Sequence, residues 1–265
     1  MTPIAVTIAG SDSSGGAGIQ ADLKTFSALG VYGASVVTAL TAQNTTGVSA
    51  IHDVPPDFIA AQMDAVFADL DVRAVKIGML SQAAVIETVA RRLAHWQAPN
   101  IVLDPVMVAT SGDRLLNQDA IDVLKRVLIP RALVITPNLP EAAALLDEAM
   151  ARTEVEMSRQ GERLLALGAR AVLIKGGHGE GSESVDLLVE KGSVTRLVAE
   201  RVPTKNTHGT GCTLSSAIAA GLAKGEELAA AAQEAKTFVS AAIRASQRLA
   251  VGGGHGPVHH FQAWW

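Results

Sequence analysis

The sequence predicts an α/β fold in which a mainly parallel central sheet is flanked by helices, and two observations support this prediction. Short β-branched runs alternate with amphipathic stretches along nearly the whole chain, which is the pattern of consecutive strand–helix–strand units. Aromatic residues make up only 3% of the 265 residues and hydrophobic residues 48%, so Ala, Val, Leu and Ile must build the core. Such a core favours buried parallel strands covered by Ala-rich helices.

The expected strands and helices follow one another in order. We expect strands at residues 4–9, 33–40, 74–77, 101–104, 133–136 and 171–175. Helical patterns lie between them at residues 17–29, 56–70, 83–96 and 119–128. Ligands of such sheets bind outside the carboxyl ends of the strands. Functional residues are therefore expected in the loops that follow the strands.

The pattern changes once, towards the C-terminal part of the chain. Apolar runs at residues 185–189 and 194–198 flank the segment EKGS, which is typical of an antiparallel hairpin. Two Ala-rich helices then follow, at about residues 211–223 and 226–250. No internal repeat and no Pro/Ser-rich linker divides the sequence, so we expect a single domain over residues 1–265.

Charge and cysteine content exclude several classes of protein. The net charge of −4 and the isoelectric point of about 6.0 leave no broad basic surface for nucleic acid, although a local cationic pocket for phosphates is compatible with them. The only cysteine is Cys212, which excludes an intrachain disulfide and fits a reducing compartment. No apolar run approaches the ~20 residues that a membrane helix needs. These observations predict a soluble cytoplasmic protein that binds neither nucleic acid nor membrane.

A glycine-rich segment at residues 10–18 follows the first expected strand and opens a helix. Residues 16–21 match the dinucleotide pattern G-x-G-x-x-A, which requires an acidic residue about 20 positions further on. No Asp or Glu lies between Asp22 and Asp53, so an NAD site is disfavoured. The segment is either a flexible glycine turn or a loop that lets its backbone approach a small substrate. The sequence holds no Walker A motif either.

A second glycine-rich segment, NTHGTGCTLSSA at residues 206–217, immediately precedes an Ala-rich helix. Small residues there let consecutive N–H groups converge at a helix N-terminus, where the dipole favours negative charge. Gly209, Thr210 and Gly211 would then form an anion hole suited to phosphoryl transfer. The alternative is an ordinary helix start that Thr210 or Thr213 caps.

Cys212 lies at the same expected helix start. A lone cysteine is commonly a small core residue. At a helix N-terminus, however, the thiol pKa is expected to fall below its free value of about 8.5. The thiolate could then take the proton of an attacking hydroxyl as a general base.

Two further segments could hold a metal and a nucleotide. Asn138 and Glu141 follow an expected strand and begin a helix, and Asp104 stands at the end of another strand. Hard oxygen ligands of this kind suit Mg²⁺, which binds through few carboxylates and keeps its waters. Each residue also has a structural interpretation. Asn138 and Glu141 have the spacing of a capping box, and Asp104 precedes Pro105 as a turn residue does.

As an ordered set, these segments resemble the hydroxymethylpyrimidine/phosphomethylpyrimidine kinases of thiamin synthesis, within the ribokinase-like superfamily. The resemblance is carried by IAGSDSSGGAGIQADLK (8–24), TALTAQNT (38–45), KIGML (76–80), DPVM (104–107), TPNLPEA (136–142), IKGGH (174–178), NTHGTGCTLS (206–215) and GPVHHF (256–261).

The resemblance implies a ribokinase-like fold, ATP as co-substrate and Mg²⁺. The reaction that the resemblance implies is the phosphorylation of 4-amino-5-hydroxymethyl-2-methylpyrimidine to the monophosphate and then to the diphosphate. Its substrate pocket would be formed by Gly10, Gln43, Met79 and Val106, with Asp22 as a further polar contact. Gln43 supplies a donor and acceptors that complement an aminopyrimidine edge.

The resemblance also assigns the phosphoryl-transfer residues. The anion hole is implied at Gly209, Thr210, Gly211 and Cys212, where many superfamily relatives carry a basic Asp at the last position. The resemblance further places Mg²⁺ and its waters at Glu141 and Asp104. The nucleotide is expected beside Lys175, Asn138, Asn206 and Thr207, with Lys175 against the phosphates. Members of the family are typically dimeric, so we expect a homodimer.

Two other functions are compatible with these residues. Pyridoxal also presents a hydroxymethyl group on a heteroaromatic ring, so a pyridoxal kinase or a dual-specificity kinase is the nearest alternative. A pyrimidine-binding protein without catalytic activity is the other, and the intact glycine segment, Cys212, Glu141 and Lys175 argue against it. We expect His255, His259 and His260 to pack in the C-terminal segment rather than to bind a metal.

Overall fold

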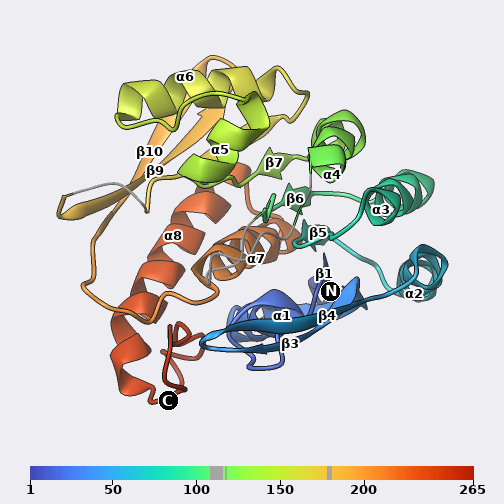
Figure 1. Cartoon of the computed structure of the whole chain (residues 1–265), viewed down its shortest axis with the longest axis horizontal. Coiled ribbons are helices and arrows are strands. Elements are labelled where there is room, and N and C mark those ends of the chain that lie inside the picture. The colour runs from blue at the N-terminus through green and yellow to red at the C-terminus, as the bar shows by residue number, and fades with distance from the viewer. Residues whose placement is uncertain (108–115, 117, 178–180) are drawn as a thin grey trace.

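The computed structural model describes residues 1–107, 116, 118–177 and 181–265. Its strands are β1 (Ile4–Ala9), β2 (Tyr32–Val37), β3 (Ala39–Asn44), β4 (Gly47–Asp53), β5 (Ala74–Ile77), β6 (Ile101–Leu103), β7 (Val134–Ile135), β8 (Ala171–Lys175), β9 (Glu183–Glu190) and β10 (Ser193–Glu200). Its α-helices are α1 (Gly18–Ala28), α2 (Pro56–Asp69), α3 (Ala83–His95), α4 (Gln118–Val123), α5 (Leu139–Leu146), α6 (Glu154–Leu165), α7 (Thr210–Ala223) and α8 (Leu228–Ala245). Figure 1 shows their arrangement.

The described residues form one eight-stranded sheet with the order β10-β9-β8-β7-β6-β5-β1-β2. Strands β1, β2, β5, β6, β7 and β8 pair in parallel, whereas β9 pairs antiparallel with both β8 and β10. The prediction of a mainly parallel sheet with an antiparallel hairpin is therefore confirmed. The two strands of this hairpin are longer than predicted. β9 and β10 continue to the residues that flank their two-residue turn, and both also extend by two residues at the end away from the turn.

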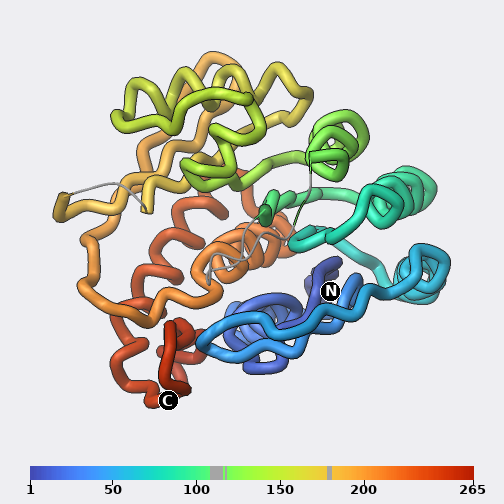
Figure 2. The backbone as a smooth tube through the Cα atoms, in the orientation of Figure 1, coloured from blue at the N-terminus to red at the C-terminus, as the bar shows by residue number. Residues whose placement is uncertain are grey.

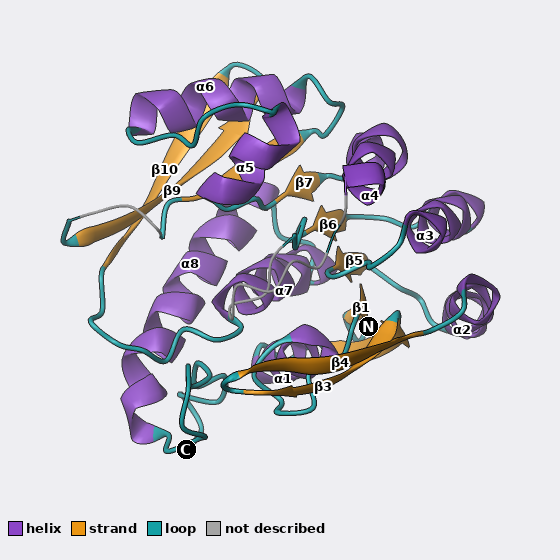
Figure 3. Ribbon diagram, viewed as in Figure 1, coloured by secondary structure: helices purple, strands orange, loops and turns teal. Residues whose placement is uncertain are grey.

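Helices cover both faces of this sheet, which makes three layers (Figure 3). Helices α2 to α6 bury their apolar sides against one face, and α1, α7 and α8 against the other. Alternate residues of a strand serve opposite layers: in β8, Val172 and Ile174 join the first core, and Ala171 and Leu173 join the second. Burial on both faces explains why the strands are nearly continuous apolar runs.

The strand predicted at residues 33–40 is present as β2, but it ends at Val37 because the chain leaves the main sheet at Thr38. Its N–H donates to the carbonyl of Ala9, and its hydroxyl donates to the carbonyl of Met79. Residues after Thr38 leave the main sheet as β3, which pairs with β4 in a separate antiparallel sheet. The β-branched run passes through the break without a Gly or Pro, so no turn signal marks it.

Smaller differences concern helix ends. The predicted helix at 119–128 is α4 followed by a π-helical turn at Leu124–Leu128, and α8 gives way to a 3₁₀ turn at Ser246–Arg248. Helix α6 is not among the predicted elements, although Thr153 and Glu156 form a capping box at its start. No helix within the described ranges is long and apolar enough to cross a bilayer.

The C-terminal segment holds the tip of the β3–β4 hairpin (Figure 2). The N–H of Gly254 lies 3.2 Å from the hydroxyl oxygen of Thr45, and the N–H of His255 lies 2.9 Å from its carbonyl oxygen. Because two-stranded sheets are marginally stable alone, these bonds help to fix the hairpin. Through it they fix Gln43, which lies on β3.

Candidate active site

A cavity of about 720 Å³ opens beyond the carboxyl ends of β1, β5, β6 and β8, where the parallel sheet was expected to place a ligand. Most of the candidate residues named from the sequence line it. They are Gly10, Gln43, Met79, Asp104, Val106, Asn138, Glu141, Lys175, Thr207, Gly209, Thr210, Gly211 and Cys212. Segments that lie far apart in the sequence are thus brought together at one edge of the sheet.

Two candidates do not line the cavity. Asp22 is completely buried, and its carboxylate is bound to Lys76, Thr7 and Ser216, so no oxygen is left to face a substrate. Its expected role as a substrate contact is corrected on that ground. Asn206 donates from its amide nitrogen to the carbonyl of Ser246 at 3.0 Å, which makes it a brace of the loop before α7. His178, in the IKGGH segment, lies outside the described residues.

The loop after β1 is organised around the buried carboxylate of Asp12. It accepts hydrogen bonds from the backbone N–H groups of Ser14, Gly16 and Ala17 at 2.8–3.0 Å, and His208 Nε2 lies 2.7 Å from it. Burial disfavours the charged form, but the hydrogen bonds from His208, Ser14 and Ala17 outweigh burial and hold the Asp12 pKa far below its usual value. This carboxylate ties the first loop to the segment before α7.

The N-cap position of helix α7 is one that only glycine can occupy. Gly209 has a φ of +77°, and a Cβ built there would lie 1.9 Å from the carbonyl oxygen of Gly16. The alternative of a threonine cap is wrong. The hydroxyl of Thr210 donates to the carbonyl of Thr207 at 2.6 Å, and that of Thr213 to the carbonyl of Gly209 at 2.8 Å. Within the described part of the chain no side chain caps this helix; the Thr210 N–H meets the carbonyl oxygen of Thr207 at 3.2 Å, and Thr210, Gly211 and Cys212 line the cavity.

Cys212 is half-buried in the cavity wall, and its pKa contradicts the expectation from the sequence. Burial raises the pKa of the thiol to about 11. The positive charge of Lys76 lowers it, but Asp22 and Asp104 add to the rise. The helix N-terminus alone was expected to favour the thiolate, and this expectation omitted the loss of water around the sulfur and the two carboxylates.

A lysine and two carboxylates lie together beside the start of α7. Lys175 Nζ is 2.8 Å from Asp104 Oδ1 and 3.9 Å from Glu141 Oε2. Burial raises the pKa of Glu141 to about 7; Lys175 opposes the rise and Asp104 adds to it. For Asp104, burial works against ionisation, yet Lys175 and Lys76 hold its pKa below the ordinary value. The two carboxylates are therefore shifted apart: the pKa of Asp104 lies below its ordinary value and that of Glu141 above it.

The structural roles predicted for Asn138, Glu141 and Asp104 are present in the structure. Asn138 and Glu141 do form a capping box, with 2.8 Å from each side-chain oxygen to the partner's N–H. The backbone of Asp104 does make a turn, because its carbonyl accepts from the Val106 N–H at 2.8 Å. Neither role removes the side chain from the cavity, since both acids line it. Structural and functional roles coincide here.

Two lysines of the cavity were not assigned from the sequence. Lys76 stands in β5 between apolar neighbours, and Lys236 of α8 forms a 2.8 Å ion pair with Asp186. Each breaks a local pattern: Lys76 interrupts a buried strand, and Lys236 lies on the buried side of α8 with Ala232 and Val239. A charged residue at a core position was the signal that could have found them.

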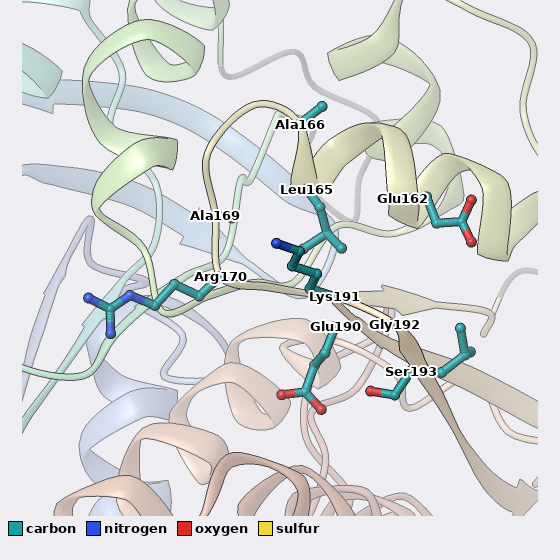
Figure 4. Close-up of a pocket in the computed structure, with 10 residues that line it drawn as sticks. Glu162, Leu165, Ala166, Ala169, Arg170, Glu190, Lys191, Gly192 and Ser193 are labelled. Carbon is teal, nitrogen blue, oxygen red and sulfur yellow. The ribbon is translucent and has the colours of Figure 1, made fainter.

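A second hollow, of about 830 Å³, lies at the other end of β8 (Figure 4). It is lined by the end of α6, by Arg170 just before β8, and by the β9–β10 turn. Although it is slightly larger than the first cavity, no candidate residue named from the sequence lines it. Its position at the amino end of β8 is the wrong edge of the sheet for a ligand of a parallel α/β fold.

A helix N-terminus beside a lysine and two carboxylates, at the ligand edge of a mainly parallel sheet with helices on both faces, defines a phosphotransferase of the small-molecule kinase class. The comparisons identify the family. Residues 12–259 match the family model described as phosphomethylpyrimidine kinase. The chain therefore belongs to the phosphomethylpyrimidine kinase family, and its fold is ribokinase-like.

Individual relatives agree with this assignment. The chain is 59% identical over 265 residues to the hydroxymethylpyrimidine/phosphomethylpyrimidine kinase of Rhizobium meliloti (strain 1021), with 100% of this chain and 99% of the relative covered. It is 53% identical over 258 residues to a thiamine biosynthesis bifunctional protein of Geobacter sulfurreducens, covering 97% of this chain and 52% of that protein. Among solved structures, an ADP complex of Bacillus subtilis pyridoxal kinase superposes with a TM-score of 0.92 at 38% identity, covering 99% of each chain.

Proposed function

We propose that this chain transfers the γ-phosphoryl group of ATP to the hydroxymethyl group of 4-amino-5-hydroxymethyl-2-methylpyrimidine, and then a second phosphoryl group to the monophosphate, in thiamine biosynthesis. One observation carries the proposal: the residues suited to a pyrimidine and those suited to phosphates line the same cavity. The names of the relatives, a hydroxymethylpyrimidine/phosphomethylpyrimidine kinase and a thiamine biosynthesis protein, support it. The ADP complex of the structural neighbour supports ATP as co-substrate.

The pyrimidine binds in the half of the cavity formed by the first loop and the β3–β4 hairpin. Gln43 is held there by Ser13, whose hydroxyl oxygen accepts from the Gln43 N–H at 2.8 Å. Its side-chain amide offers a donor and acceptors to the ring and its amino group. Met79 and Val106 supply apolar contacts to the ring, and Gly10 leaves room, since a Cβ there would lie 2.5 Å from the Met79 methyl carbon.

The phosphates bind in the other half. Lys175 lies directly beside the N-terminus of α7, because a Cβ at Gly211 would lie only 3.2 Å from Lys175 Nζ. N–H groups of the Gly209–Cys212 segment and the ammonium group then stabilise the negative charge that builds up on the transferring phosphoryl group. Asn138 and Thr207 border the nucleotide, and Asn206 acts indirectly by bracing the loop before α7.

Cys212 has two parts in this proposal. Its N–H belongs to the anion hole, and its sulfur accepts the hydroxyl proton as the oxygen attacks phosphorus. The raised pKa means that the sulfur rests as a thiol in the empty cavity, so ionisation must be assisted. Once ionised, a group of high pKa is a strong base. The nearby ammonium groups therefore matter to the reaction.

The carboxylates fit a magnesium ion. Among the described residues no three or more His, Cys, Asp or Glu side chains gather into a metal site, and the pair Asp104 and Glu141 lines the cavity. One or two carboxylates together with waters and substrate phosphates form the usual Mg²⁺ site of phosphoryl-transfer enzymes. The raised pKa of Glu141 indicates a position where a further positive charge is welcome. Bound there, Mg²⁺ would offset the charge of the phosphates.

The oligomeric state and the cellular location are also proposals. We infer a homodimer, because the β3–β4 hairpin exposes a large apolar side chain on each of its faces: Leu40 is 52% and Ile51 43% exposed. We infer a cytoplasmic location, because the single cysteine needs no oxidising compartment and the proposed reaction consumes ATP.

Phosphorus NMR of the purified protein with Mg·ATP and the hydroxymethylpyrimidine tests the function. The expected result is a monophosphate signal followed by a diphosphate signal. Monophosphate alone would reduce the proposal to a single alcohol phosphorylation. No product from a folded protein would support a pyrimidine-binding protein. Pyridoxal, the substrate in the name of the structural neighbour, serves as competitor: a much higher kcat/KM for pyridoxal would contradict the pyrimidine assignment.

A further inference from the structure

A buried positive charge lies in the floor of the active-site cavity, and the proposed reaction does not yet use it. Lys76 belongs to β5 in the middle of the sheet, is fully buried, and lines the cavity. Its Nζ is 2.9 Å from Asp22 Oδ2, and Asp22 is also fully buried. Two isolated charges are costly to remove from water, and a hydrophobic pair of equal volume would commonly be as stable. The cost of this pair indicates a role other than stability.

The surroundings hold this charge in one place. Asp22 accepts a hydrogen bond from Thr7 at 2.6 Å through Oδ2 and one from Ser216 at 2.7 Å through Oδ1, so its carboxylate is fixed from a strand and from α7. A Cβ at Gly78 would lie 2.7 Å from Lys76 Nζ, so the glycine leaves space for the ammonium group. Ser216 follows Cys212 by four residues on α7, which places both on one side of that helix.

Cys212 and Lys76 line the same cavity, and Ser216, one turn after Cys212, holds the carboxylate that pairs with Lys76. Four charged side chains act on the thiol: Lys76 from β5, Asp22 from α1, Asp104 after β6 and Lys175 at the end of β8. The N–H of Gly18 also points at it. Lys76 is the strongest of the charges that oppose burial, and Asp22 acts in the other direction. Burial keeps the pKa of the thiol high, and the two buried charges shift it in opposite directions.

We propose that Lys76 is a positioning residue that acts through Cys212: its fixed charge, anchored by Asp22 beneath the cavity floor, favours the thiolate and so prepares the sulfur to take the proton of the attacking hydroxyl. The thiolate accepts that proton while the new oxygen–phosphorus bond forms and the bond from the γ-phosphorus to the leaving oxygen of ADP breaks. The inference deepens the proposed function and rests on its assignment of Cys212.

The test uses the fact that Cys212 is the only cysteine. Alkylation by iodoacetamide, a neutral reagent, is followed by intact mass at a series of pH values between about 7 and about 11 in the absence of nucleotide and metal. Lys76→Met is expected to move the alkylation profile to higher pH by about one unit or more, which is about a tenfold slower reaction at a pH of about 8. Asp22→Asn is expected to move the profile in the opposite direction.

Opposite shifts distinguish electrostatics from damage, because both variants disturb the same buried pair. An unchanged profile in folded Lys76→Met, or equal shifts in both variants, would overturn the proposal. If Lys76→Met does not fold, the double variant Lys76→Met/Asp22→Asn decides, since it leaves no unpaired charge. Its profile is expected at higher pH than that of the wild type, and an unchanged or lowered one also overturns the proposal. Turnover of Cys212→Ala, measured separately, tests the proposed function itself.

Discussion

At the scale of single residues, Cys212 is the residue whose proposed role a substitution tests most directly. We expect Cys212→Ala to keep the fold and to lower kcat by a factor of about 10²–10⁴, the usual contribution of a general base. The affinity for ATP is expected to change less than threefold, because the backbone N–H groups of the anion hole remain. Single-turnover kinetics and nucleotide binding by calorimetry would measure the two effects.

Cys212→Ser is the matched control for that experiment. It keeps a side chain of similar size but replaces the thiol by a hydroxyl, which is a far weaker acid. If the sulfur accepts the proton, serine should be nearly as slow as alanine. Full turnover in Cys212→Ala would remove the side chain from catalysis and leave the position only its N–H.

Glu141 makes a second prediction at this scale, on stability against pH. Its pKa is about 7 in the folded protein, against an ordinary value of 4.5 in the unfolded chain, so between these values the folded state holds a proton that the unfolded chain has lost. The stability that this proton contributes is present below pH 4.5 and is lost as pH rises through 7. Glu141→Gln, which cannot ionise and can keep the capping box, should therefore gain about 1–3 kcal/mol relative to the wild type between a pH of about 5 and about 8.

Urea unfolding of both proteins at the two pH values measures the difference. Glu156→Gln is the control, because Glu156 occupies the equivalent position of an exposed capping box in α6 and its pKa is lowered rather than raised. That variant should show no gain at high pH. A gain in both variants, or in neither, would mean that burial of Glu141 does not govern its ionisation.

At the scale of elements, the first loop and the start of α7 behave as one unit because Asp12 joins them. We expect Asp12→Asn to lower kcat/KM for the pyrimidine by a factor of about 10–10², since an amide cannot accept all the bonds that the carboxylate receives and geometry sets the rate. Steady-state kinetics with each substrate varied would measure it. Ser14→Ala is the control, because it removes a single partly buried bond to Asp12 and should cost less than threefold. An equal loss in both variants would indicate a general weakening of the loop.

The elements also show how far a sequence can be interpreted. Alternation of strand and helix patterns predicted the parallel sheet, because buried strands and amphipathic helices differ in period wherever both faces are covered. The break at Thr38 could not be predicted, since its cause is the bonding of Thr38 to Ala9 and Met79, which are distant in the chain. Local pattern identifies an element more reliably than it locates the point where tertiary bonds end it.

In the candidate active site, too, local features could be predicted from the sequence and features set by distant residues could not. Residues in glycine-rich or strand-end loops could be named in advance, because loop chemistry is local. The position of Asp22 could not, since its burial depends on Lys76 and Ser216 from other elements. The pKa of Cys212 was predicted in the wrong direction for that reason: the helix start is visible in the sequence, whereas the surrounding apolar wall and carboxylates are not.

At the scale of the whole molecule, the β3–β4 hairpin is the element that the fold does not cover. It forms its own two-stranded sheet, outside the three layers, and such a sheet is marginal without further packing. The C-terminal segment holds only its tip, at Thr45. Cross-strand pairs share a face and Thr41 pairs with Ile51, so Leu40 and Ile51 lie on opposite faces of the hairpin. Leu40, on the face away from the cavity-lining Thr41, would be buried if a second copy of the chain packed there.

We therefore expect light scattering of the wild type to give about twice the chain mass of 27.4 kDa, and the variant Leu40→Glu to give the mass of one chain. A charge in an apolar interface is costly to bury, so the dimer should weaken by about tenfold or more. Val194→Glu is the matched control, since Val194 is 46% exposed on β10, at the opposite edge of the sheet from β2. A monomeric wild type, or dissociation by Val194→Glu, would contradict the hairpin interface.

Because Gln43 lies on β3, a dissociated but folded variant should also bind the pyrimidine more weakly while ATP affinity stays unchanged.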